Sequence, residues 1–400
     1  MQRINIWGNK VTRFDEKIER LNTNSYKWDR MTDEEKERGT LPFWVADSDY
    51  KTLEEISLSL VERSKHEAYG YTICSDSYYQ SVINWFKETK DVALKKEWIV
   101  PFCGVVTTLY LSIHLFTKKK DFVTINTPVY NPFYYVINKN KRGMLCNKLV
   151  EINDTYEIDF NDLEEKLSKC KMYILCNPHN PVGRSFNKEE LDKIVELCKK
   201  HKVILVVDEI HSDIILDDNK FISIANYFDV YDKIIMCTAP SKTFNIAGIQ
   251  CANIIIKNKA MRLKFKDLIE AMSLSSPNVF ALCACESAYT YGREWVKEQN
   301  KYIAKSRDYV YSFFKERVPK AKLYKLEATY LMWINLEFLH TNSDEMVKEL
   351  KEFGVWVNGG KVYGEDYSGY IRLNIACPFA QLKEGLERIE KYILEKEKKI

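Results

Sequence analysis

The sequence lacks a strong charge bias, a long apolar run and an apolar leader. Basic and acidic residues nearly balance, at 60 against 57, and the formal net charge is +3. This balance offers no electrostatic case for binding nucleic acid or an anionic membrane, whereas small, neutral or zwitterionic partners stay open. The longest apolar runs, such as residues 203–207, are far too short to cross a bilayer, and the opening MQRINIWGNK has no apolar core for a signal peptide. We therefore expect a cytoplasmic protein.

Several motifs are missing as well. Eleven cysteines are scattered without a CxxC pair, and because their number is odd they cannot all form intramolecular disulfides. Reduced thiols in a cytosol are therefore expected. No GxGxxG opens a helix after any predicted strand, which argues against a dinucleotide-binding oxidoreductase.

Internal repeats and flexible linkers are absent too, so the organisation must be inferred from pattern changes. The chain has 400 residues, of which 46% are hydrophobic and 29% charged, an ordinary globular balance. Between about residues 98 and 257, short apolar runs alternate with helix-length amphipathic segments. These runs are WIVPFC, DFVTIN, MLCNKLV, KMYILC, VILVVD, KIIMCT and CANIIIK. Continuous β-branched runs joined by helical crossovers predict an α/β domain with a mainly parallel seven-stranded sheet flanked by helices.

After Pro277 the pattern changes to long helical stretches over 278–318. A strand YLMWINLEF, a helix near 342–353, a strand YIRLNIA and a closing helix over 381–399 follow. This order predicts a smaller α+β domain, around which the first 40 residues are expected to wrap. The predicted units are an N-terminal segment of the small domain over 1–45, the large domain over 46–286 and the C-terminal small domain over 287–400.

Polar residues stand at the predicted ends of four strands. They occur in the runs YILCNPHNPVGR, VILVVDEIHSDI, IIMCTAPSKTFNIAG and FCGVVTTLYLSIHLF. In the last run Gly104 stands where a strand gives way to a helix, which leaves backbone N–H groups free. Ligands of open parallel sheets bind where the carboxyl ends of the strands converge, so these residues are expected to share one site. The candidates are Gly104, Asn177, His179, Asn180, Asp208, His211, Thr238, Ser241 and Lys242.

Each candidate alone has an ordinary explanation. Gly104 could be a turn glycine, Asp208 a helix N-cap and Lys242 an exposed charge. His179 and His211 could suggest a metal, but neither an HExxH motif nor a Cys/His cluster supports one, so we predict no metal site.

Taken together, the candidates have one shared chemical use, which is to hold pyridoxal phosphate. A lysine amine kept away from water can form a Schiff base with an aldehyde, and this cofactor supplies the aldehyde. Its pyridine nitrogen must stay protonated to accept electrons, which requires a fixed carboxylate, and Asp208 is the strand-end acid of the set. Asn180 can donate to the ring oxygen, and Tyr130 of TPVYNPF can cover the ring. The phosphate can be bound by a helix start and hydroxyls, from Gly104, Val105, Thr238 and Ser241.

The chain resembles a known superfamily at this point. The order Gly104, Tyr130, Asn180, Asp208, Lys242 and Arg372 is similar to that of the fold-type I, class I and II aminotransferases, over nearly the whole chain. Eight ordered motifs resemble the branch of the cystathionine β-lyases and cystalysin-like carbon–sulfur lyases. They are LPFWVADSDY, YGYT, GVV, TPVYNPF, NPHNPVGR, DEIHSDI, APSKTFNIAG and YIRLNIACP.

The resemblance implies a role for each matching residue. Lys242 would join the cofactor and move protons, Asp208 would hold the pyridinium, and Arg372 would clamp the substrate carboxylate. Tyr71 of YGYT would reach the phosphate of the neighbouring subunit, which implies a homodimer with composite sites. The implied cofactor-binding set is Tyr71, Gly104, Val105, Val106, Tyr130, Asn180, Asp208, His211, Thr238, Ser241 and Lys242. The implied substrate-binding set is Ala46, Asn180 and Arg372.

Three positions depart from related patterns. Gln250 stands where aspartate-type aminotransferases carry a phosphate-binding arginine, as expected of the lyase branch. Asn131 stands where some lyases have a second tyrosine, and Ser48 replaces the methionine of an ADMDF motif. These departures affect the phosphate, the leaving group and the substrate entrance respectively.

The implied reaction is α,β-elimination on a sulfur amino acid, such as cystathionine or a cysteine S-conjugate, giving a thiol, pyruvate and ammonia. Aminotransfer between an amino acid and a 2-oxo acid shares the first half of this reaction and stays an alternative. A non-catalytic regulator that binds the cofactor is an alternative of another class. The N-terminus offers neither the length nor the basic patch of a winged helix, which counts against that regulator.

Overall fold

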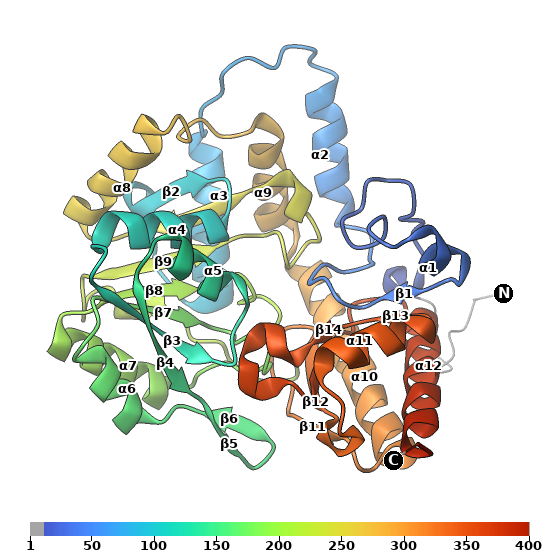
Figure 1. The fold of residues 1–400 in the computed structure, drawn as a ribbon. Helices are drawn as coiled ribbons and strands as arrows, with labels where there is room; N and C mark the ends of the chain where they lie inside the picture. Colours follow the sequence, from blue (N-terminus) through green and yellow to red (C-terminus); the bar gives the residue numbers. More distant parts are fainter. Residues whose placement is uncertain (1–11, 400) are drawn as a thin grey trace.

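The computed structural model describes residues 12–399, so the opening stretch MQRINIWGNK lies outside the described residues. A seven-stranded sheet forms the centre of the fold, in the order β2-β10-β9-β8-β7-β3-β4 (Figure 1). Its strands are β2 Ile99–Phe102, β3 Phe122–Thr127, β4 Gly143–Lys148, β7 Met172–Cys176, β8 Ile204–Asp208, β9 Ile234–Thr238 and β10 Ala252–Ile255. All seven predicted strands are therefore confirmed, and so is the α/β fold class.

Five neighbouring strands, from β9 through β8, β7 and β3 to β4, are parallel, while β10 runs antiparallel to both β9 and β2. The expected helical crossover between β9 and β10 is absent, because the chain turns back through the short 3-10 helix η4 Ala247–Ile249. This returning segment carries Ser241 and Lys242, so it occupies the carboxyl end of the sheet.

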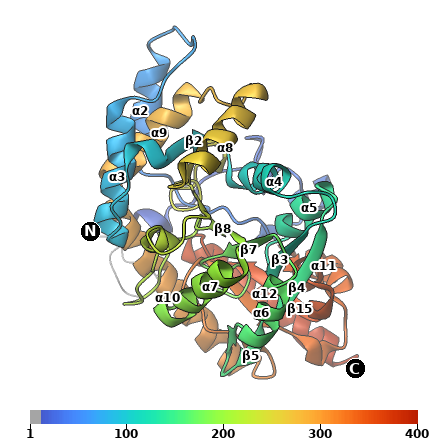
Figure 2. The same ribbon diagram turned by 90° about the vertical axis from the view of Figure 1, so that its left-hand side faces the viewer.

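Both faces of the sheet are covered by helices, which explains the unbroken apolar runs (Figures 1 and 2). Ile174 and Val206 face a core shared with α4, α5 and α8, whereas Leu175 and Val207 face a core shared with α3, α6 and α7. Successive strand residues point to opposite faces, so burial on both sides requires apolar side chains at every position. The helices are α3 Asp76–Lys90, α4 Val105–Phe116, α5 Pro132–Lys139, α6 Phe160–Leu167, α7 Lys188–His201, α8 Lys259–Ala271 and α9 Val279–Tyr291.

A second, four-stranded antiparallel sheet follows in the C-terminal part, in the order β11-β12-β15-β14. Its strands are β11 Lys322–Leu323, β12 Leu331–Asn335, β14 Asn358–Gly359 and β15 Tyr370–Asn374. The accompanying helices are α10 Arg293–Arg317, α11 Ser343–Glu352 and α12 Phe379–Glu397. The predicted helices and strands after Pro277 are thus present, whereas the exact domain boundaries stay predictions.

The N-terminal segment packs beside this C-terminal part (Figure 1). It contains the short helix α1 Asp33–Glu37 and the strand β1 Leu41–Pro42, which pairs in parallel with β13 Val355–Trp356. The helix α2 Glu54–Ser64 then leads, through residues 65–75, to α3. A hairpin of β5 Val150–Ile152 and β6 Thr155–Glu157, which the sequence pattern did not predict, leaves the end of β4. No helix in the described part is both long and apolar enough to cross a membrane.

Candidate active site

A cavity of about 390 Å³ lies at the carboxyl ends of β7, β8 and β9 and at the start of α4. The structure brings ten of the predicted residues together around it. They are Ala46, Gly104, Val105, Val106, Tyr130, Asn180, Asp208, His211, Ser241 and Lys242. The cavity is also lined by Gln250 and by five residues that the sequence reasoning missed, Cys103, Thr107, Cys176, Ile210 and Ala247. Four of these five, all but Ala247, stand next to a predicted residue in the sequence. This proximity is the signal that could have identified them.

Lys242 stands in the turn after β9. Its Nζ donates to the backbone oxygen of Ala46 at 2.6 Å. Burial lowers the pKa of this amine below its usual value of 10.5, nearby Arg372 lowers it further, and the carboxylates of Asp47 and Asp208 partly oppose the shift. A lowered pKa increases the fraction of neutral amine, the form that acts as a nucleophile and as a base.

Asp208 ends β8 and is 4% exposed. Its Oδ1 accepts a hydrogen bond from the backbone N–H of Ile210 at 3.0 Å. Burial raises the pKa of this carboxyl to about 6, although that N–H and the charge of Lys242 partly oppose the shift. A buried carboxylate of this kind is stabilised when a cationic group binds it, so Asp208 suits a protonated ring nitrogen.

Asn180 and Arg372 form a second polar group beside the amine. The Nη1 of Arg372 donates to Asn180 Oδ1 at 3.1 Å, and its Nη2 donates to the Trp44 oxygen at 2.6 Å. The guanidinium is 2% exposed, and its Nε has no hydrogen-bond partner among residues 12–399. Arg372 lies behind Asn180 and does not itself line the cavity. A buried guanidinium with an unused donor is suited to a carboxylate ligand.

The start of α4 provides a place for an anion. Gly104 is the N-cap and offers no side chain to the first backbone N–H groups of the helix. A Cβ built on Gly104 would meet nothing within 4 Å, so this helix start is open. Val105, Val106 and Ser241 line the cavity beside it. Backbone donors and the helix dipole together favour a phosphate at such a position.

His211 lines the cavity and packs edge-on against Tyr330, with ring centroids 5.8 Å apart. Its Nδ1 has no partner in the described part of the chain. Burial, followed by the charges of Lys242 and Arg372, lowers the pKa of its imidazole to about 3. The ring is therefore neutral at physiological pH and can offer one N–H to a ligand.

Besides Arg372, four predicted residues lie outside the cavity lining, and they are Tyr71, Asn177, His179 and Thr238. Thr238 is buried, pairs with Asn253 of β10 and is not part of the cavity lining. Tyr71 lies in the segment between α2 and α3, fully exposed at 102%, and does not reach the cavity of its own chain. His179 is buried, with Nε2 2.7 Å from the Pro128 oxygen and Nδ1 3.2 Å from the Cys176 oxygen. Within the described residues, no group of three or more His, Cys, Asp or Glu side chains is arranged to hold a metal.

The residues around the cavity fit pyridoxal phosphate. The amine of Lys242, the buried carboxylate of Asp208 and the open start of α4 supply a partner for the aldehyde, the ring nitrogen and the phosphate respectively. Arg372, which lies behind Asn180, is the candidate partner for an amino acid carboxylate. Each role assigned to a single residue remains a prediction.

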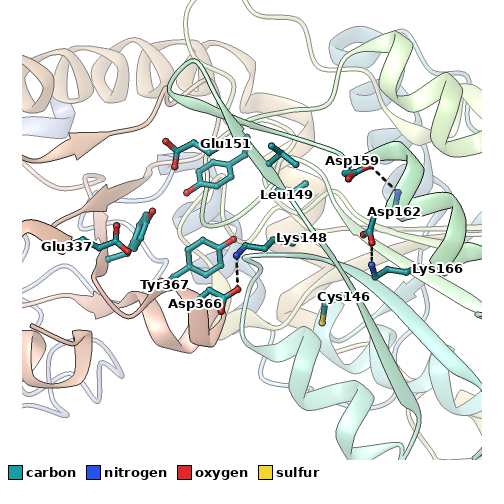
Figure 3. A pocket seen from close by; sticks show the side chains of 13 residues that line it. Cys146, Lys148, Leu149, Glu151, Asp159, Asp162, Lys166, Glu337, Asp366 and Tyr367 are labelled. Carbon is teal, nitrogen blue, oxygen red and sulfur yellow. Dashed lines mark hydrogen bonds and ion pairs between the residues drawn. The ribbon is translucent and has the colours of Figure 1, made fainter. Parts of the chain in front are cut away.

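A larger cavity of about 590 Å³ lies elsewhere, between β4, α6 and the C-terminal part (Figure 3). Its carboxylates are already engaged, since Asp366 pairs with Lys148 at 2.8 Å and Asp162 pairs with Lys166. None of the strand-end candidates lines it. Size alone therefore does not identify the active site, and the smaller cavity is the chemically equipped one.

Glu209, next to Asp208, makes the stability of the fold depend on pH. It is fully buried, and its carboxyl accepts from Ser223 Oγ at 2.8 Å and from the Ile224 N–H at 2.6 Å. Burial raises its pKa from 4.5 to about 7. The folded protein therefore holds this proton more tightly than the unfolded chain, and the resulting stability is lost as the pH rises to about 7.

Glu209→Gln is expected to remove this dependence. Between about pH 5 and pH 8 the wild type should lose up to roughly 3 kcal/mol of unfolding free energy that the variant keeps, at about 1.4 kcal/mol per pH unit. Urea unfolding of both proteins across this range measures the difference. Parallel pH profiles would show that Glu209 does not titrate in this range.

Comparisons with known proteins agree with this geometry. The family described as aminotransferase class I and II matches residues 21–389. Cystathionine beta-lyase PatB of Bacillus subtilis is 40% identical over 381 residues, which cover 94% of this chain and 98% of that relative. The crystal structure of cystalysin from Treponema denticola, which contains a pyridoxal 5'-phosphate cofactor, has a TM-score of 0.91 at 33% identity, covering 96% of this chain and 99% of its own. The PLP-bound C-S lyase from Staphylococcus hominis has a TM-score of 0.89 at 31% identity, covering 96% of this chain and 98% of its own.

Proposed function

The chain belongs to the class I and II aminotransferase family, and from this premise we propose that it is a pyridoxal-phosphate-dependent carbon–sulfur lyase. It eliminates a thiol from the β-carbon of a sulfur amino acid, with cystathionine and cysteine S-conjugates as the substrate class. Water is consumed, and pyruvate and ammonia leave with the thiol. The similarity to a cystathionine beta-lyase at 40% identity and to two solved carbon–sulfur lyase structures supports this proposal.

The residues of the cavity divide the work of this reaction. When bound, the cofactor stores the electron pair that is released at the substrate Cα. The neutral amine of Lys242 takes the proton from this carbon, a contribution of about 10²- to 10⁴-fold to the rate. Asp208 keeps a proton on the ring nitrogen, and Arg372 binds the substrate carboxylate so that the Cα lies near Lys242.

One observation carries the proposal most strongly. Lys242, Asp208 and Asn180, with Arg372 bonded behind Asn180, meet at one cavity, although they come from separate parts of the chain. The purified protein should show visible absorbance from its cofactor and should release pyruvate from cystathionine without added 2-oxo acid. Sulfide, ammonia and pyruvate measured across a panel of sulfur amino acids identify the substrate. Turnover that requires a 2-oxo acid would instead indicate an aminotransferase.

We further propose that the active unit is a homodimer. Tyr71 is fully exposed and cannot serve its own cavity, and the same region exposes Tyr69, Ile73 and, on α2, Leu58 and Val61. An exposed apolar group of this kind is typical of a surface that another chain covers. A second copy that brings Tyr71 to the phosphate is the occupant that the family resemblance implies.

Eleven unpaired cysteines support a reducing compartment, the cytoplasm.

If each active site contains residues from both subunits, two variants that are inactive alone should regain activity when they are combined. Tyr71→Ala and Lys242→Ala chains, expressed together, should form mixed dimers in which one site receives both intact residues. Activity should rise above that of either variant alone, towards about a quarter of the wild type for random pairing. Sedimentation of the wild type gives the oligomeric state independently. A monomer, or a mixture no more active than its parts, would contradict the composite site.

A further inference from the structure

Residues 44–49, which we call the strap, pass beside the cavity, where Ala46 is part of the lining, and several of their backbone oxygens accept hydrogen bonds from side chains. The Trp44 oxygen accepts from Arg372 Nη2 at 2.6 Å, and the Ala46 oxygen accepts from Lys242 Nζ at 2.6 Å. The oxygens of Val45 and Asp47 both accept from Asn374 Nδ2, at 2.6 and 2.7 Å. The strap thus connects the amine and the guanidinium of the site through a few consecutive peptide groups.

A cluster of two cations and two carboxylates, of which Lys27 and Asp49 are buried, holds the strap. Asp49 Oδ1 accepts from Arg20 Nη1 at 2.7 Å and from Trp28 Nε1 at 2.9 Å. Its Oδ2 accepts from Lys27 Nζ at 2.8 Å and from Gln381 Nε2 at 3.0 Å. Four donors on one carboxylate leave Asp49 fully engaged.

The cations also bind the strap directly. Arg20 Nη2 pairs with Asp47 Oδ2 at 3.0 Å, and Arg20 Nη1 donates to the Ser48 oxygen at 3.0 Å. Lys27 Nζ donates to the Asp47 oxygen at 3.1 Å. Exposed fractions of only 1% for the Lys27 side chain and 3% for that of Asp49 place this pair away from water.

A buried ion cluster contributes little net stability, since desolvation offsets much of the attraction between its charges. It does impose geometry, because removing one member leaves a buried charge unpaired. None of Arg20, Lys27, Asp47 and Asp49 lines the cavity. Arg20, Lys27 and Asp49 can therefore affect the reaction through the strap, whereas the carboxylate of Asp47 also raises the pKa of the Lys242 amine directly.

We propose that the Arg20–Lys27–Asp47–Asp49 cluster is a positioning device that sets the strap, and through its oxygens aligns Lys242 with Arg372. This inference rests on the proposed function in so far as the two groups act on one amino acid. The spacing between them decides whether a substrate that is held by its carboxylate presents its Cα to the amine. Small displacements at such a centre cost about 10²-fold in rate.

The test is Asp49→Asn, which keeps the shape of the side chain and removes its charge. The matched control is Glu16→Gln, which removes the same charge from the exposed Lys51–Glu16 pair of the same segment. The affinities of the cofactor-loaded proteins for two probes, L-alanine and ethylamine, are measured by the change in cofactor absorbance. Ethylamine differs from L-alanine only in lacking the carboxylate. Amide hydrogen exchange of residues 43–50 is measured on the cofactor-free proteins.

In Asp49→Asn, L-alanine should bind about tenfold more weakly while ethylamine binding changes little, and the strap amides should exchange faster. KM for the sulfur amino acid should rise more than kcat falls. Trp28→Phe, which removes one neutral donor, should shift the same quantities less, and it replaces Asp49→Asn if that variant does not fold. The proposal would be overturned if Asp49→Asn had the same amide exchange rates in the strap, and the same ratio of L-alanine to ethylamine affinity, as Glu16→Gln. A wild type without cofactor absorbance would count against the proposed function, whereas the exchange data would still test the strap.

Discussion

Lys242→Ala is expected to abolish turnover, with kcat/KM for the sulfur amino acid falling by at least about 10⁴-fold. The variant loses both the amine that binds the cofactor covalently and the base that takes the Cα proton. It should also lose the visible absorbance of the covalent linkage, even when the cofactor is supplied in excess. Steady-state pyruvate release and absorbance spectra measure the two losses separately.

The matched control for this variant is Lys188→Ala, which removes a lysine that is 64% exposed and pairs with Asp192 on α7. It should retain wild-type turnover and absorbance. Far-UV circular dichroism of Lys242→Ala should match that of the wild type. A Lys242→Ala protein that keeps both absorbance and turnover would refute the role of this amine.

Arg372→Ala is expected to raise KM for amino acid substrates by about 10²- to 10³-fold, with a smaller effect on kcat. The guanidinium is buried and has a donor to spare, and charged hydrogen bonds to a carboxylate contribute about 1.5–3 kcal/mol each. Arg372→Lys keeps the charge but loses the planar fork, so its KM should lie between those of the wild type and the alanine variant. Competition by L-alanine in the elimination assay provides a second measure of carboxylate affinity.

Arg262→Ala is the control for removing a buried arginine, since Arg262 is 8% exposed and donates to the Ile256 and Lys257 oxygens, remote from the cavity lining. It should lower stability without changing KM. Unaltered KM in a folded Arg372→Ala protein would mean that another group binds the carboxylate.

The sheet could be predicted because its signal is local. Residues 204–208 are apolar up to their final aspartate, and the structure buries them on both faces of the central sheet. The fold class, which rested on alternating strand and helix patterns, and the family, which rested on ordered motifs, are confirmed. The antiparallel direction of β10 relative to β9 could not be predicted in this way. A short apolar run has the same hydrophobic pattern whether the strand is parallel or antiparallel to its neighbour.

The site was predictable to the extent that its residues follow strands. Asp208 and Lys242 each end or follow a strand, and the topology alone brings such positions to one edge of the sheet. The strap cluster was not predictable, because Arg20 and Lys27 meet Asp49 through a loop without a regular period. Nor did residue type separate Thr238 from Ser241, of which only Ser241 lines the cavity.

The central claim is that Lys242 is the residue joined covalently to pyridoxal phosphate. The direct measurement is borohydride reduction of the purified protein, followed by peptide mass spectrometry to locate the trapped cofactor. The account predicts a single modified site, on Lys242, in the peptide that contains SKTFNIAG. Attachment to another lysine, or no attachment in protein that has been supplied with the cofactor, would contradict it.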